Sequence, residues 1–99
     1  MKINGLKWKI KTLDPDDERL NEDATYMGLC VFLEQTIYIR AGMSKEQTKR
    51  TVLHELIHAI IFSYGLDPDM DEEGICNFVS AHFDEITNLM SEVKNGIIH

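Results

Sequence analysis

The chain has 99 residues, of which 43% are hydrophobic and 27% are charged, a composition that is ordinary for a soluble globular protein. Its 17 acidic residues outnumber its 10 lysines and arginines, which gives a net charge of -7. A protein that binds nucleic acid directly is expected to carry a basic face, so we expect no direct nucleic-acid partner. The length predicts a single domain that covers residues 1–99.

Targeting and redox signals are weak in this sequence. No stretch approaches 18 apolar residues, and Met1 to Trp8 lack the uninterrupted apolar segment of a signal peptide. We therefore expect a cytoplasmic protein that does not interact with a membrane. The two cysteines, Cys30 and Cys76, do not form a C-x-x-C motif, and we expect free thiols rather than a disulfide framework.

Three segments have the patterns of β-strands. Leu6, Trp8 and Ile10 alternate with lysines, which predicts a strand with one buried face and one solvated face. The run from about Tyr26 to Leu33 is rich in β-forming residues, and Thr36 to Arg40 alternates again. The two residues between these last segments are enough for a hairpin link. We predict a small, three-stranded, mostly antiparallel sheet.

Two helices are predicted after the strands. Ser44 to Gln47 match a capping box, apolar residues follow at helical spacing, and Gly65 is a natural stop. A second helix is predicted from about Glu72 to about Lys94. Its expected apolar stripe consists of Ile75, Val79, Phe83, Ile86, Met90 and Val93. The fold class is therefore α+β, with the sheet packed on two main helices.

The first of these helices carries the sequence His54-Glu55-Leu56-Ile57-His58. Positions i and i+4 lie about 40° apart on one helical face, so the imidazoles of His54 and His58 can bind one metal ion. This H-E-x-x-H spacing is typical of zinc hydrolases, in which the glutamate acts as general base on a metal-activated water. We predict one zinc ion bound by His54 and His58, with Glu55 as the catalytic residue.

A catalytic zinc site needs a third protein ligand and an open position. The candidates in the second helix are Glu72, Glu73, His82 and Asp84. The first turn of that helix follows the metal helix by a short loop, so its carboxylates can return to the histidines. Spacing favours Glu73, because it shares its face with smaller and more polar residues than Glu72 does. Glu72 remains an alternative at this point.

The segments His54 to His58 and Glu73 to Asn77 resemble those of gluzincins. The resemblance implies that Glu73 is the third zinc ligand and that Asn77, one turn later, supports a ligand histidine. The chain is also similar to minimal metallopeptidase domains of the ImmA/IrrE type and to small phage-encoded zinc peptidases, over roughly Tyr26 to Phe83. This similarity implies a minimal zincin-like fold. In zincins the substrate pairs with an edge strand, which would here be about Tyr26 to Phe32, although the apolar run would also suit a central strand.

The function expected from these motifs is that of a zinc metalloendopeptidase acting on a peptide or protein substrate. Tyr64 and His82 are candidates for stabilising the oxyanion. One alternative is a zinc-stabilised protein-interaction module without turnover. Another is an accessory domain that cleaves one partner only after a complex has formed. The sequence leaves the substrate, the cleavage site and the oligomeric state open.

Overall fold

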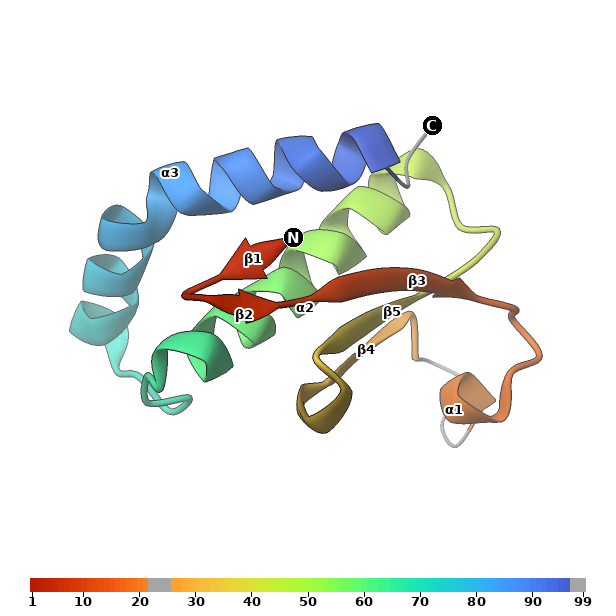
Figure 1. Ribbon diagram of the computed structural model, residues 1–99, viewed down its shortest axis with the longest axis horizontal. Helices are drawn as coiled ribbons and strands as arrows, with labels where there is room; N and C mark the ends of the chain where they lie inside the picture. The colour runs from red at the N-terminus through yellow and green to blue at the C-terminus, as the bar shows by residue number, and fades with distance from the viewer. Residues whose placement is uncertain (22–25, 97–99) are drawn as a thin grey trace.

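The computed structural model describes residues 1–21 and 26–96 of the chain. Its elements follow one another around a long central helix, α2 (Figure 1). In chain order they are β1 (Lys2–Ile3), β2 (Leu6–Lys7), β3 (Lys9–Leu13), α1 (Glu18–Asn21), β4 (Gly28–Val31), the 3-10 turn η1 (Phe32–Glu34), β5 (Thr36–Arg40), α2 (Lys45–Tyr64) and α3 (Glu72–Gly96). The α+β class and the two main helices are confirmed.

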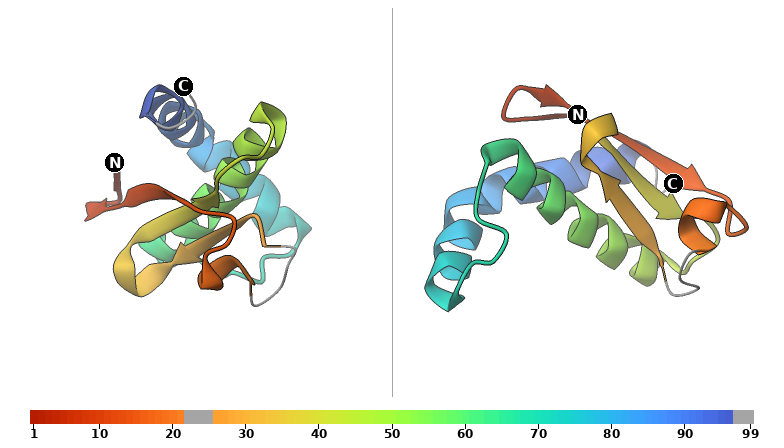
Figure 2. Two further views of the ribbon diagram at one scale, coloured as in Figure 1. Left: turned by 90° about the vertical axis from the view of Figure 1, so that its right-hand side faces the viewer. Right: turned by 90° about the horizontal axis from the view of Figure 1, so that it is seen from below.

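The helix α2 lies between the three-stranded sheet and α3, as the side view in Figure 2 shows. The sheet has the order β3-β5-β4, so β4 is an edge strand. β4 pairs with β5 in an antiparallel hairpin, as predicted, with Gly28 opposite Ile39. β3 pairs with β5 in the parallel direction, so the prediction of a mostly antiparallel sheet is wrong. The reason is that the chain reverses its direction between β3 and β4 and again between β4 and β5. β5 therefore runs in the same direction as β3 and pairs with it on the side opposite to β4.

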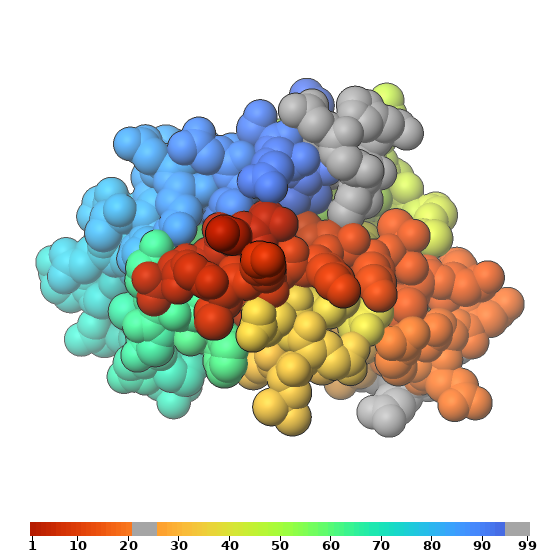
Figure 3. Space-filling view, in the orientation of Figure 1, coloured from red at the N-terminus to blue at the C-terminus, as the bar shows by residue number. Residues whose placement is uncertain are grey.

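The N-terminal segment is not one continuous strand. The chain turns at Asn4 and Gly5, which have φ angles of 48° and 82°, and β1 and β2 form a separate antiparallel pair. This pair lies across the middle of the face seen in Figure 3, between α3 and the segment around η1. The Asn-Gly dipeptide is a strong hairpin signal, because both of its residues tolerate positive φ. The predicted alternation is nevertheless confirmed, since Trp8 is buried and Lys7 is exposed.

Both predicted ends of α2 are confirmed. The side chain of Ser44 accepts a hydrogen bond from the N–H of Gln47 at 3.1 Å. At the other end Gly65 has a φ of 65°, and its N–H donates to the last carbonyls of the helix. These caps satisfy backbone groups that a helix leaves unpaired at its termini. They fix the helical register that puts His54 and His58 on one face.

The hydrophobic core lies between α2, the inner face of the sheet, the N-terminal hairpin and the second half of α3. Trp8 is only 2% exposed, and its indole N–H donates to the hydroxyl of Ser63 at 2.9 Å. The predicted apolar stripe of α3 is only partly confirmed. The residues that α3 buries are Phe78, Ile86, Leu89 and Val93, whereas Ile75, Val79 and Phe83 are exposed.

The difference lies in the first half of α3, where Phe78 packs into the core while Ile75, Val79 and Phe83 face outwards; in the second half the predicted Ile86 and Val93 are buried. None of the helices in the described part of the chain is long and apolar enough to cross a membrane.

Candidate metal centre

His54, Glu55 and His58 come together on one side of α2. One potential ligand atom from each side chain lies within 4.8 Å of those from the other two. The two imidazole rings are 5.0 Å apart between centroids, with an angle of 70° between their planes. Two nitrogen ligands of one tetrahedral zinc ion are roughly 3.4 Å apart, given Zn–N distances of about 2.0–2.1 Å. Small rotations of these side chains therefore suffice to bring the donors around a cation.

Glu55 differs from the two histidines in its environment. Its side chain is buried, at 7% exposure, whereas His54 and His58 are exposed. Its Oε2 atom has no hydrogen-bond partner among the described residues. Burial raises the pKa of the Glu55 carboxyl above its usual value, and the nearby imidazoles of His54 and His58 oppose that shift. A buried, unpaired carboxylate next to two imidazoles is an environment that favours a bound cation.

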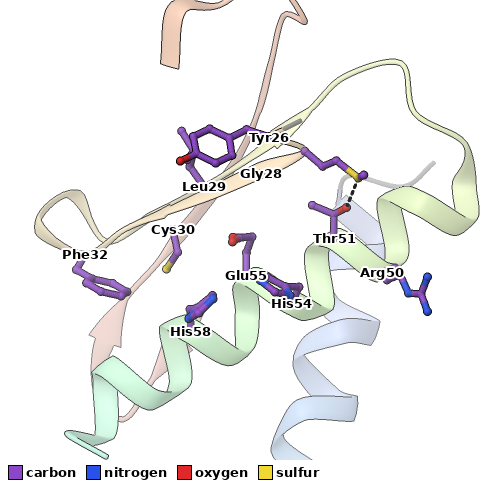
Figure 4. A pocket seen from close by; sticks show the side chains of 11 residues that line it. Tyr26, Gly28, Leu29, Cys30, Phe32, Arg50, Thr51, His54, Glu55 and His58 are labelled. Atoms are coloured by element: carbon purple, nitrogen blue, oxygen red, sulfur yellow. Dashed lines mark hydrogen bonds between the residues drawn. The ribbon is translucent and has the colours of Figure 1, made fainter. Parts of the chain in front are cut away.

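These three side chains line a pocket of about 520 Å³ between α2 and β4 (Figure 4). This volume is within the range of small-molecule binding sites, which is about 300–1,000 Å³. In Figure 4 the Glu55 side chain points from the helix towards the strand, with Phe32 near the His58 end of the pocket. The pocket is thus open to a ligand that lies along β4.

Gly28 permits β4 to approach the helix at this point. A Cβ atom at Gly28 would lie 2.8 Å from Cγ2 of Thr51 and 3.1 Å from Cγ of Glu55. Real Cβ atoms essentially never approach another heavy atom to within 3.0 Å, so a side chain at Gly28 would force Thr51 or the strand to shift. The sequence reasoning missed this residue. A glycine inside an otherwise apolar strand segment was the available signal, since it often marks a close backbone approach.

The free edge of β4 runs along the same pocket. The N–H of Arg40 donates to the carbonyl of Met27 at 2.8 Å. In an antiparallel pair, hydrogen-bonded residues alternate with residues whose backbone groups face away from the partner strand. Gly28 and Cys30 therefore direct their N–H and C=O groups away from β5, and no described strand pairs with them there. The prediction that this segment is an edge strand is confirmed.

Glu73 is not brought into the group formed by His54, Glu55 and His58. It lies in the first turn of α3, where it and Glu72 are exposed, and neither residue lines the pocket. Asn77 is likewise exposed and outside the pocket lining. The roles of Glu73 as third ligand and of Asn77 as its supporting neighbour stay predictions.

The two oxyanion candidates lie elsewhere in the molecule. The hydroxyl of Tyr64 donates to Glu85 at 3.0 Å, and Nδ1 of His82 lies 3.1 Å from the other carboxylate oxygen of Glu85. The two aromatic rings are in contact, with centroids 4.7 Å apart. Neither residue lines the pocket, so this cluster connects α2 to α3.

Both cysteines are free, as predicted. Cys76 is exposed on α3, whereas Cys30 is half-buried and lines the pocket on β4. Burial, together with the negative charge of Glu55, raises the pKa of the Cys30 thiol to about 12.

A scan against protein-family models found no match, and searches of curated proteins and of solved structures found no similar protein. The functional assignment therefore depends on the spacing and geometry of the residues in this chain. These establish a group of His54, Glu55 and His58 that could hold a metal ion.

Proposed function

We propose that the protein is a zinc-dependent metallopeptidase whose active centre is the pocket between α2 and β4. The observation that carries this proposal is the convergence of His54 and His58 on a buried carboxylate, Glu55, that has no hydrogen-bond partner in the described part of the chain. Two imidazoles are ligands that suit zinc, and a buried carboxylate beside them suits a general base. When bound, the ion would act as a Lewis acid and make a water molecule more acidic.

Residues of the chain would bind the cation and transfer the proton. His54 and His58 would hold the cation, because their rings lie on adjacent turns of the capped helix α2. Glu55 would take a proton from the attacking water, whose oxygen forms a bond to the scissile carbonyl carbon. The carboxyl would then give that proton to the leaving nitrogen as the C–N bond breaks.

An extended peptide is the substrate class that the edge of β4 favours. The outward-facing backbone groups of Gly28 and Cys30 can pair with a peptide backbone, as in other cases of strand addition. Such pairing recognises the backbone rather than particular side chains. The pocket lining supplies mainly apolar contacts, from Tyr26, Met27 and Phe32.

The proposal is tested by measuring zinc content and hydrolysis of an unfolded, fluorescently labelled protein mixture. Glu55→Gln should retain zinc and lose hydrolysis by a factor on the order of 10² to 10⁴, the usual contribution of a general base. His54→Ala and His58→Ala should lose both. His82→Asn is the matched control, because His82 is a histidine outside the pocket, and it should retain both. Activity that persists after removal of the metal would refute the mechanism.

The second candidate is a zinc-stabilised interaction module without turnover. The observation that favours it is the exposed apolar row Ile75, Val79 and Phe83 on α3, at 51%, 42% and 57% exposure. An apolar row of this kind on a solvated surface is typical of a protein contact. Full zinc occupancy without hydrolysis of any labelled protein would favour this module over the peptidase.

A further inference from the structure

The group on α2 supplies too few ligands for a catalytic zinc site. Such a site takes three protein ligands and keeps one position open. If Glu55 remains free to act as a base, only His54 and His58 are left. Among the residues that line the pocket, the remaining side chain of a type that binds zinc is Cys30. We propose that Cys30 is the third protein ligand of the cation, an inference that depends on the proposed metal site.

The alternation of β4 turns Cys30 towards the metal helix. Leu29 and Val31 pack on the opposite side of the sheet, against the small cluster around Leu13, Leu20 and Tyr38. Cys30 packs with the main core, on the side of α2. Figure 4 shows its side chain pointing from β4 towards the helix.

The close approach at Gly28 fixes where along α2 the thiol lies. Gly28 is in contact distance of both Thr51 and Glu55, one helical turn apart. Cys30 is two residues further along a strand that runs in the same direction as the helix in Figure 4. Two strand residues span about 6.6 Å, which equals the rise of roughly four helical residues. This places Cys30 above the turn that carries His58.

A second observation indicates that this part of the pocket is built for a cation. Glu55 points into the space between α2 and β4, and its Oε2 lacks a partner within the described residues although the side chain is more than nine-tenths buried. The Cys30 thiol does not donate to this oxygen. A divalent cation held near Glu55 by other ligands would offset the negative charge of the buried carboxylate.

The Sγ atom of Cys30 is not in the set of atoms that all lie within 4.8 Å of one another. Rotation of its χ1 angle between staggered positions moves Sγ by about 3 Å, which a half-buried side chain can accommodate. The resulting set of two imidazoles and one thiolate is softer than a set with a carboxylate. The site should therefore discriminate more strongly against manganese and magnesium than a set that contains Glu73 would.

The test is the absorption spectrum of the cobalt-substituted protein, which does not depend on hydrolysis. In Cys76→Ser the only thiol left in the chain is Cys30, because the sequence has two cysteines. We expect cobalt to produce a thiolate-to-metal charge-transfer band in the near ultraviolet in this variant and in the native chain. Cys30→Ser should lose the band. It should also lose metal affinity by at least the factor, on the order of 10 to 100, that removal of an outer partner costs.

The possible failures are distinguishable. If cobalt binds in a manner that requires His54 and His58 but produces no thiolate band, the assignment of Cys30 is wrong and the metal site stands. A large loss of affinity in Glu73→Gln with none in Cys30→Ser would likewise overturn it, in favour of Glu73. If no cobalt binds to the folded Cys76→Ser protein, the metal site fails together with the proposed function.

Discussion

Replacing Glu55 with glutamine should stabilise the metal-free protein while abolishing its activity. The side chain is 7% exposed, and one of its carboxylate oxygens has no hydrogen-bond partner among the described residues. An unsatisfied buried acceptor costs about 1–3 kcal/mol, and a charged one costs more. A neutral amide of the same shape removes the charge from this environment. For a chain of this size, each kcal/mol corresponds to a rise of about 4–8 °C in the melting temperature.

The stability that Glu55→Gln gains over the native chain should increase with pH. The pKa of Glu55 is raised in the folded protein, so the folded state binds its proton more tightly than the unfolded state does. Between the unfolded pKa and the raised folded pKa, the free energy of unfolding of the native chain therefore falls as the pH rises. Below the unfolded pKa this penalty is absent, and above the folded pKa it is complete. Glu55→Gln should lack this component, so its advantage over the native chain should increase as the pH rises through this interval.

Thermal unfolding in the presence of a chelator, from pH 4 to pH 8, measures this effect. Glu46→Gln on the same helix is the matched control, because Glu46 is exposed and its replacement should change stability by less than about 0.5 kcal/mol. Zinc at 100 times its dissociation constant should add about 2.7 kcal/mol to the native chain. An unchanged or lower melting temperature of metal-free Glu55→Gln at neutral pH would refute the reasoning.

Three further substitutions test the contact between β4 and α2, the hydrogen bond of Trp8 in the core, and the C-terminal cap of α2. Gly28→Ala should cost about 1–3 kcal/mol by overpacking against Thr51, and it should reduce hydrolysis because β4 moves away from α2; urea unfolding and the peptidase assay measure the two effects. Ser63→Ala should cost about 1–3 kcal/mol in urea unfolding, because the buried indole N–H of Trp8 loses its acceptor, with zinc affinity unchanged. Gly65→Ala should cost about 1 kcal/mol, measured by thermal unfolding, since its φ of 65° is strained for alanine.

Each of these three predictions has a control variant or a result that would contradict it. Gly74→Ala adds the same methyl group outside the pocket and should leave hydrolysis unchanged, so an equal loss in both glycine variants would contradict the role of Gly28. A change in zinc affinity on Ser63→Ala would show that the Trp8 contact reaches the site. A Gly65→Asn variant should be less destabilised than Gly65→Ala, because asparagine tolerates positive φ better.

Local features of the sequence were sufficient to predict the metal helix. The capping signal at Ser44, the stop at Gly65 and the four-residue spacing of His54 and His58 all act within a few turns of one helix. A helix imposes its own geometry on residues four apart, so their proximity needs no tertiary information. The hairpin of β4 and β5 was predictable for the same reason, because its strands are adjacent in the chain.

The tertiary structure decided what surrounds that helix. Which face of α3 is buried, and whether β3 runs parallel to β5, depend on packing between segments far apart in the chain. The same is true of the approach of Gly28 to Thr51 and Glu55, and of the place of Cys30 in the pocket, across more than 20 residues of sequence. Spacing along the chain predicts which metal-binding side chains lie on one face of a helix, whereas only tertiary packing determines which strand lies next to them.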